Sequence, residues 1–544
     1  MSELLPSVSS EPAARWWRDS VIYQLYVKSF ADSDGDGIGD LDGIIARLDH
    51  IAELGVDGIW LNPCYPSPNR DGGYDVADYT QIDGRYGGMA AFDRLLSACH
   101  QHGLKLLMDL VPNHCSDQHA WFQQALTAEP GSAERERFIF RDGRGAGGAE
   151  PPNNWRSTFG GSAWTRLGGG QWFLHSFDSS QPDFNWDNPE VVEMFDDVLR
   201  LWFDRGIDGF RIDVAYAMVK HAGLPDLADP DGHNPYLWNQ PGVHEIFKRW
   251  RVIAEGYQRE LTLLGEVWLP PSDAADYIRA GELNQVFYFD LLQQPFEAGA
   301  FKLSIDESLA GLKHVEGVPT WTLNSHDVHR SVSRYGLVEP EPMSTGDVNA
   351  VRTRPRGRVD VELGQARATA ATLLVLGLPG SVYLYQGEEL GLPEAQELPA
   401  ESRQDPIWAR SGHTEYGRDG CRVPLPWTTD GPSLGFSVTG IPWLPQPTWY
   451  PRFAAQAQRA DPDSVLSFYR AALRVRRQFD PAAALEWLES GRDEVLAFRR
   501  GRLTCVTVFD GEPFVVPAAW GELICRSRPG TGALTAASTG WYLG

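Results

Sequence analysis

Three carboxylates follow short apolar segments, at points where strands are predicted to end. They are Asp213 after "GFRI", Glu266 after "LTLLG" and Asp327 after "PTWTLNSH". A single carboxylate after a strand is more often a helix cap or a salt-bridge partner than a catalytic group. Three on separate strands crowd like charges, which pushes their pKa values apart and leaves one group protonated while another ionises. Such a set favours chemistry that needs a nucleophile, a proton donor and charge-stabilising groups, as cleavage of a glycosidic bond does.

A second acidic pattern, "DSDGDGIGD" at residues 32–40, has the spacing of a metal-binding loop. Three alternate aspartates followed by glycine match the first half of an EF-hand loop. The twelfth position, where an EF-hand needs a bidentate glutamate, is Gly43, and the preceding "VIYQLYV" is typical of a strand rather than a helix. We therefore predict a structural one-ion loop after a strand, not a calcium sensor. An acidic turn without metal is the alternative.

The segments that would position these residues repeat one pattern: an amphipathic helix, a glycine turn, a short apolar strand and a polar residue. It appears in "DLDGIIARLDHIAELGVDGIWLNP", "MAAFDRLLSACHQHGLKLLMDLVPNH" and "VVEMFDDVLRLWFDRGIDGFRIDVA". With a first strand near Val21 to Val27, later apolar segments bring the candidate strands to eight: "LTLLGEVW", "QVFYFDL", "PTWTLNSHD" and "SVYLYQGEEL". Continuous apolar strands are typical of a parallel sheet buried on both faces. Eight of them alternating with helices predict an α/β fold, the (β/α)8 TIM barrel.

The barrel is not evenly spaced, and we predict three parts. Residues 1–112 and 179–478 form the barrel, with a long loop at 387–460 after the eighth strand. Residues 113–178, rich in Gly, Pro, Asn and Trp, form a lobe over the barrel mouth. Residues 479–544 alternate and turn like antiparallel strands, which predicts a C-terminal β domain. Two further stretches are predicted only as loops with some helix: 225–252 and 339–361.

Composition narrows the class of partner and compartment. The net charge of −25 argues against nucleic acid or an anionic membrane as partner and suits a neutral substrate. No apolar run is long enough to span a bilayer, and the N-terminus lacks the basic and apolar regions of a signal peptide. Six cysteines without a C-x-x-C pair suggest neither a disulfide framework nor a zinc site. We expect a cytoplasmic protein, and the sequence does not predict its oligomeric state.

Four motifs, in order along the chain, carry a resemblance to a known family. They are "DLVPNH" at 109–114, "GFRIDVA" at 209–215, "GEVW" around Glu266 and "NSHD" at 324–327. Together they resemble the four motif regions of the α-amylase family, glycoside hydrolase family 13. "SPNRDGGYDVADY" and "WWRDSVIYQLYVKSF" resemble its α-glucosidase and oligo-1,6-glucosidase branch in particular.

The resemblance implies a TIM barrel, a lobe inserted after strand three and a C-terminal antiparallel β-sandwich. It also implies retaining chemistry, in which Asp213 matches the nucleophile and Glu266 the general acid/base. Asp327 matches the third carboxylate, which binds sugar hydroxyls and favours the distorted ring. Further residues match substrate-binding positions: Tyr74, Asp75, His114, Arg211, His326 and Arg418.

Among these binding residues, Tyr74 matches a stacking platform and the two histidines match groups that hydrogen-bond the first glucose. Arg211, two residues before Asp213 on one strand, points to the same side and can hold that carboxylate ionised. Asp75 is expected to pair with Arg418 and so close the site beyond one glucose, which makes the enzyme exo-acting. Arg422 is the rival for the role of Arg418.

For the acidic loop, the family match implies one bound ion. The implied ligands are the backbone carbonyl of Ile38 and the side chains of Asp32, Asp34, Asp36 and Asp40. Because oxygen ligands in a flexible shell suit the larger ion, Ca2+ is favoured, with Mg2+ as the alternative.

The expected activity is release of glucose from the non-reducing end of maltose and short α-gluco-oligosaccharides through a covalent β-glucosyl-Asp intermediate. Val214 resembles α-1,6-preferring members, whereas "GEVW" and "FRIDVAYAMVK" look more like enzymes for α-1,4 links, so α-1,4 or mixed action is favoured. A glucosyl-transferring or isomerising relative, such as a trehalose synthase or a sucrose-active enzyme, is the alternative. A non-catalytic relative of the fold would be expected to lack some of the carboxylates and to carry a membrane segment.

Overall fold

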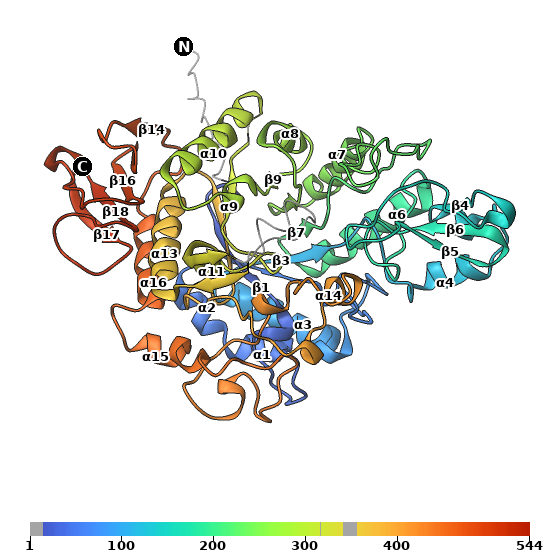
Figure 1. Cartoon of the computed structure of the whole chain (residues 1–544), viewed down its shortest axis with the longest axis horizontal. Helices are drawn as coiled ribbons and strands as arrows, with labels where there is room; N and C mark the ends of the chain where they lie inside the picture. The colour runs from blue at the N-terminus through green and yellow to red at the C-terminus, as the bar shows by residue number, and fades with distance from the viewer. Residues whose placement is uncertain (1–14, 316, 341–355) are drawn as a thin grey trace, which may run out of the picture.

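Eight parallel strands form the central sheet of the computed structural model (Figure 1). In sheet order they are β10 (Thr320–Thr322), β13 (Ser381–Tyr385), β1 (Val21–Leu25), β2 (Gly58–Leu61), β3 (Lys105–Leu110), β7 (Gly209–Ile212), β8 (Thr262–Gly265) and β9 (Gln285–Val286). A parallel bridge between Phe287 and Thr320 joins the two ends of this order, so the sheet closes into a barrel. The predicted TIM barrel is confirmed.

The structure describes residues 15–315, 317–340 and 356–544. Residues 1–14, in which we predicted no signal peptide, and most of the predicted loop 339–361 lie outside the described residues. The described residues around that loop pair as β11 (Leu337–Pro340) and β12 (Gly357–Val359). In the described part of the chain, no helix has both the length and the apolar character needed to cross a bilayer.

Helices follow the strands and surround the barrel, as a buried parallel sheet requires. They are α1 (Leu41–Ala46) and α2 (Leu48–Leu54) after β1, α3 (Gly88–Gln101) after β2, α6 (Pro189–Arg205) before β7, α7 (Val243–Glu255) after β7, α8 (Pro271–Ala275) after β8, α9 (Asp290–Gln293) and α10 (Ala298–Gly311) after β9, α11 (Ser331–Gly336) and α13 (Val361–Gly377) after β10, and α14 (Pro406–Arg410), α15 (Ala455–Arg459) and α16 (Val465–Arg476) after β13.

The helix α6 shows how the sequence determines these elements. Asn188 caps its N-terminus by accepting the N–H of Glu190, and Pro189 occupies the first turn, where its missing N–H costs nothing. Gly206 ends the helix with a φ of 116°, in the left-handed region. The apolar face predicted from spacing is buried, including Phe195 and Trp202. The turn at Gly206 then delivers the chain into β7, which carries Arg211.

The segment predicted as the inserted lobe lies between β3 and α6. It contains α4 (Ala120–Thr127), α5 (Ala133–Glu136) and an antiparallel sheet in the order β4 (Phe140–Asp142), β6 (Gln171–Leu174), β5 (Trp164–Arg166). Its buried tryptophans pack with Leu224, Leu227 and Leu237 from the chain after β7. The indole N–H of Trp155 donates to the Pro225 carbonyl at 2.8 Å. The segment at 225–252, predicted as loops with some helix, therefore begins as a support for the lobe and ends in the helix α7.

The C-terminal part is antiparallel, as predicted. Its named strands form one five-stranded sheet in the order β14 (Leu485–Leu488), β15 (Val495–Arg500), β16 (Leu503–Val508), β18 (Ser538–Leu543), β17 (Glu522–Arg526). One face joins the main core through Phe498 and Trp541, and the other is covered by Phe514 and Leu534, which form an antiparallel bridge. This sheet and the lobe lie on opposite sides of the barrel, red and cyan in Figure 1.

Candidate active site

Arg211 contacts three carboxylates at the C-terminal ends of the barrel strands. Its Nη1 lies 2.8 Å from Asp109 Oδ1 and 2.8 Å from Asp213 Oδ1, and its Nη2 lies 2.7 Å from Glu266 Oε2. Arg211 is in β7, Asp213 follows β7, Glu266 follows β8 and Asp109 is in β3. All four side chains are buried. The predicted convergence of Asp213, Glu266 and Arg211 on one mouth is seen in the structure.

The charges of this cluster leave a proton to be shared. Burial raises the pKa of Asp213 well above its ordinary range, Glu266 and Asp109 raise it further, and Arg211 opposes them. Burial likewise raises the pKa of Asp109 to about 6, against the lowering effect of Arg211. Because one guanidinium cannot neutralise three carboxylates, the cluster keeps a proton while its other members ionise. Glycosidic cleavage likewise needs one carboxyl that is protonated beside another that is ionised.

Asp327, unlike Asp213 and Asp109, has two arginines at one carboxylate. Its Oδ1 lies 2.9 Å from Arg422 Nη2 and 3.1 Å from Arg418 Nη1. Burial on its own raises the pKa of Asp327, but His326 and the two arginines outweigh it, and the pKa lies below its ordinary range. Asp327 is therefore ionised and suited to accept hydrogen bonds from sugar hydroxyls. Arg418 and Arg422, considered as rivals from the sequence, both contact it.

Tyr74 and His326 form one wall of the site. Their rings stack with centroids 5.3 Å apart and an interplanar angle of 8°. The Tyr74 hydroxyl donates to Asp109 Oδ2 at 2.9 Å, and Gln24 Nε2 lies 2.6 Å from His326 Nδ1. Burial lowers the pKa of His326 well below its ordinary value, so the ring is neutral. With Nδ1 accepting from Gln24, the hydrogen is assigned to Nε2, which lies 3.2 Å from Asp327 Oδ2.

The expected pair between Asp75 and Arg418 is wrong. Arg418 Nη2 lies 2.5 Å from Asp71 Oδ1 instead, four residues earlier. Asp75 accepts hydrogen bonds from the Ser67 hydroxyl at 2.9 Å and the Arg70 N–H at 3.0 Å, with the Asp71 N–H at 3.2 Å. Asp75 thus holds the turn that presents Asp71 to the site.

His114 reaches the same group through a glutamine. Gln181 Nε2 lies 3.2 Å from His114 Nε2 and donates to Asp71 Oδ2 at 3.0 Å. Burial lowers the pKa of His114 to about 4, so it is neutral at physiological pH. These contacts connect His114, Gln181, Asp71 and Arg418 into one group.

The residue after Asp213 is strained. Val214 has a φ of 41°, in the left-handed region that a β-branched residue rarely adopts. This conformation directs the Val214 N–H to Glu266 Oε2 at 3.0 Å. Through this hydrogen bond, the strained residue next to Asp213, the predicted nucleophile, contacts Glu266, the predicted acid/base.

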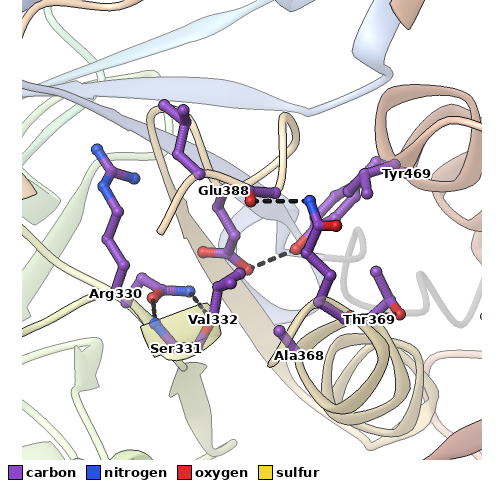
Figure 2. A pocket seen from close by; sticks show the side chains of 12 residues that line it. Arg330, Ser331, Val332, Ala368, Thr369, Glu388 and Tyr469 are labelled. Atoms are coloured by element: carbon purple, nitrogen blue, oxygen red, sulfur yellow. Dashed lines mark hydrogen bonds between the residues drawn. The ribbon is translucent and has the colours of Figure 1, made fainter. Parts of the chain in front are cut away.

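A small cavity lies next to the segment that carries Asp327, and its lining includes Asn324, Ser331, Glu388 and Tyr469. Figure 2 shows this cavity from close by. Its volume is about 10 Å3, room for about one water molecule. Asn324 Oδ1 accepts the Ser331 N–H at 2.6 Å, and Glu388 accepts from the Tyr469 hydroxyl at 2.9 Å. Burial raises the pKa of Glu388 to about 7. These contacts anchor the "NSHD" segment from behind rather than bind substrate.

The acidic loop at 32–40 fits a cation in part. One oxygen each from Asp32, Asp34 and Asp40 can lie within 4.8 Å of the others. Within the described ranges, no lysine or arginine lies within ion-pair distance of these three or of Asp36. Asp36 is not in the compact group, and burial with the other three aspartates raises its pKa. Asp40 also caps α1 by accepting the Gly43 N–H at 2.6 Å. An uncompensated cluster of carboxylate oxygens suits a hard divalent cation.

The chain belongs to the α-amylase family: residues 24–484 match the family model described as alpha amylase, catalytic domain. With the family and the acid/base cluster together, the chain is a glycoside hydrolase. It is 37% identical over 519 residues to a probable alpha-glucosidase of Rhizobium meliloti, covering 90% of this chain and 88% of that protein. It is 35% identical over 502 residues to an oligo-1,6-glucosidase of Parageobacillus thermoglucosidasius, covering 86% and 84%.

Among solved structures, the chain resembles the alpha-glucosyl transfer enzyme XgtA, with a TM-score of 0.83 and 35% identity over 97% of this chain and 99% of that one. The resemblance to the α-glucosidase and oligo-1,6-glucosidase branch, seen in the motifs, is confirmed by these relatives.

Several residues at the site were not predicted. Asp71 is in the quoted motif "SPNRDGGYDVADY", but spacing alone did not separate it from Asp75. Asp109 begins the quoted motif "DLVPNH", but the sequence analysis assigns it no role. Trp268, whose indole N–H donates to Glu266 Oε1 at 2.9 Å, gave no signal beyond lying two residues after Glu266.

Proposed function

We propose that this chain is a retaining, exo-acting α-glucosidase that releases glucose from the non-reducing end of short α-glucosides. The observation that carries the proposal is the shared contact of Asp213 and Glu266 with Arg211, at 2.8 and 2.7 Å. A carboxylate nucleophile and a carboxylic acid on one cation are the groups required for double displacement.

In the first step, the Asp213 carboxylate attacks the anomeric carbon while Glu266 gives its proton to the leaving oxygen. The bond to the leaving sugar breaks, and a β-glucosyl ester forms on Asp213. In the second step, Glu266 takes a proton from water, which attacks the same carbon and frees Asp213. Asp327, held ionised by two arginines, accepts hydrogen bonds from the sugar hydroxyls during both steps.

Exo action is supported by the buried pair of Arg418 and Asp71. Both side chains are more than nine-tenths buried, and Gln181 connects Asp71 to His114. The Phe159 ring lies 5.3 Å from the Arg418 guanidinium carbon. In this proposal, these buried groups close the site beyond the sugar held by Asp327.

The test is hydrolysis of p-nitrophenyl α-glucoside by wild type and Asp213→Asn, with the product anomer followed by NMR. Wild type should release α-glucose first, and Asp213→Asn should lose at least about 1,000-fold in kcat/KM while keeping its melting temperature. Release of β-glucose first, or full activity in the variant, would contradict the mechanism.

The second candidate is transfer of the glucosyl group to a sugar acceptor. It is favoured by the similarity to the alpha-glucosyl transfer enzyme XgtA, because any hydroxyl can intercept a glucosyl ester. A product profile on maltose, isomaltose, sucrose and trehalose separates the two. Free glucose alone indicates hydrolysis, and new disaccharides or isomerised sugar indicate transfer. The same profile decides between α-1,4 and α-1,6 preference, since the relatives are named oligo-1,6-glucosidase and probable alpha-glucosidase.

The loop at 32–40 is proposed to bind one structural Ca2+ through Asp32, Asp34, Asp36, the Ile38 carbonyl and Asp40. Support comes from the three oxygens within 4.8 Å and from the absence of a basic partner among the described residues. When bound, the ion would neutralise these carboxylates and hold the loop; it takes no part in the sugar chemistry.

A cytoplasmic location is also proposed, with a small sugar as substrate and neither nucleic acid nor a membrane as partner. All six cysteines are unpaired and buried, which suits a reducing compartment. The net charge of −25 disfavours nucleic acid and anionic membranes.

A further inference from the structure

The two oxygens of Glu266 have different partners. Oε2 lies 2.7 Å from Arg211 Nη2 and accepts the Val214 N–H at 3.0 Å. Oε1 accepts the indole N–H of Trp268 at 2.9 Å. Because two donors occupy Oε2, the transferable proton has its place on Oε1. The leaving oxygen of the substrate must therefore approach Glu266 on the side of Trp268.

Trp268 is held firmly in this position. Its ring stacks on Phe289 with centroids 4.0 Å apart and an interplanar angle of 14°. Phe289 belongs to the cluster of apolar side chains inside the barrel, and Trp268 packs against that cluster while remaining partly exposed. The indole thus has one face on the barrel interior and its N–H on the acid/base.

We propose that Trp268 is a positioning residue for Glu266, which fixes the oxygen that exchanges the proton, and that its ring borders the leaving sugar. This inference rests on the proposed function and extends it to the side of the site where the leaving group lies.

An indole N–H only donates, so it stabilises the ionised carboxylate more than the acid. Its removal takes away a hydrogen bond that favours the ionised form of the Glu266 carboxyl over the acid. The charged groups that face Glu266 are Arg211, Asp213 and Asp109, and the variant leaves all of them in place. Since Glu266 must be protonated in the first step, the alkaline limb of the kcat/KM profile should move to higher pH.

The experiment is a pH profile of Trp268→Phe, which keeps the aromatic stack and removes the N–H. We expect the alkaline limb to shift upward by about one pH unit. We also expect kcat/KM on maltose to fall about tenfold and that on p-nitrophenyl α-glucoside to fall less than about threefold, because a good leaving group needs little protonation. An unchanged alkaline limb, or equal losses on both substrates, overturns the proposal.

Two further variants keep the test independent of folding. Phe289→Leu keeps the N–H but loosens the stack, and should shift the limb in the same direction by less. Trp487→Phe is the matched control, since the Trp487 indole also donates to a carboxylate, Asp306, at 2.7 Å, but lies in β14 of the C-terminal sheet. It should leave the pH profile unchanged.

A spectroscopic readout separates this inference from the proposed function. In protein labelled with 15N at tryptophan, the indole signal lost in Trp268→Phe should move with pH in wild type and stay constant in Glu266→Gln. This result needs no turnover. If the signal titrates but no α-glucoside is cleaved, the proposed function fails and the contact stands; if it does not titrate, the inference fails whatever the activity.

Discussion

Arg418 Nη2 lies 2.5 Å from Asp71 Oδ1, and both side chains are buried. The two residues come from loops 347 positions apart, after β2 and after β13. Arg418 also contacts Asp405 at 2.6 Å and Asp327 at 3.1 Å, so it joins the closed end of the site to the third carboxylate. Burying such a pair costs desolvation free energy that its attraction barely returns, which favours a role in binding over a role in stability.

Asp71→Asn should therefore weaken substrate binding. The amide keeps the shape but removes the charge, so Arg418 loses one of its carboxylates and the sugar loses an acceptor. We expect kcat/KM on maltose to fall about 10- to 100-fold, mainly through KM. Stability should fall by about 1–3 kcal/mol, because the amide meets the donors of Arg418 and Gln181. Steady-state kinetics and thermal unfolding measure the two effects.

Asp75→Asn provides the contrast. Its carboxylate accepts from a hydroxyl and two N–H groups, and burial raises its pKa to about 6. An amide would set its own N–H2 against those donors and cost about 1–3 kcal/mol of stability. A loss of kcat/KM in folded Asp75→Asn as large as that in Asp71→Asn would contradict the separation of the binding aspartate from the supporting one.

These two aspartates also show what the sequence could predict. The carboxylates Asp213, Glu266 and Asp327 follow strands whose apolar pattern is periodic, so their common edge was predictable. Asp71 and Asp75 lie in one loop, where Gly72 and Gly73 have φ of 61° and 104°. Those left-handed turns determine which aspartate faces the site, and no periodic pattern in the sequence predicts them. The contact of Trp268 depends on Phe289, on a different loop, and was equally invisible.

Arg211→Lys should change the acid limb of the pH profile. Arg211 lowers the pKa of both Asp213 and Asp109, and a lysine ammonium cannot reach three carboxylates with the geometry of a guanidinium. The pKa of Asp213 should therefore rise. Because the nucleophile must be ionised, the acid limb of the pH profile should move to higher pH by up to about one unit.

In the same Arg211 variant, kcat/KM at the optimum pH should fall about 100-fold. Arg200→Lys is the control, since Arg200 lies on α6 and pairs with Asp197 at 3.2 Å at the surface. An acid limb that coincides with that of wild type would contradict the role given to Arg211.

Chelation should destabilise the fold more than it slows catalysis. The Gly35 carbonyl accepts from Thr439 Oγ1 at 2.9 Å, and the Gly37 carbonyl accepts the Trp443 N–H at 2.9 Å. The loop at 32–40 therefore anchors the long loop after β13, which carries Arg418. Removal of the ion leaves the aspartates to repel one another, and we expect the melting temperature to fall by a few degrees, about 1 °C for each kcal/mol lost in a chain of 544 residues.

Thermal unfolding with EGTA, followed by addition of Ca2+ or Mg2+, measures this effect and ranks the two ions. Asp32→Asn should remove most of the response, whereas Asp42→Asn, at an exposed pair with Arg94, should keep it. A melting temperature that is insensitive to chelator and to both ions would contradict the metal site.

His119 should make the protein sensitive to acid. Its ring caps α4 by accepting the Trp121 N–H at 3.3 Å, and burial lowers its pKa from 6.5 to about 4, although Asp78 opposes this. Between these values the unfolded chain binds a proton that the folded chain does not. The His119 contribution to stability is therefore full above pH 6.5 and is lost as the pH falls to about 4. The loss is at most about 3 kcal/mol.

His119→Asn tests this linkage, because asparagine is a good N-cap and does not titrate. Wild type should be the more stable at pH 7, and the difference in melting temperature should shrink or reverse by pH 4. His221→Asn, on an exposed turn, should follow wild type over the whole range. Parallel curves for wild type and His119→Asn would mean that the His119 ring is protonated as readily in the folded chain as in the unfolded one.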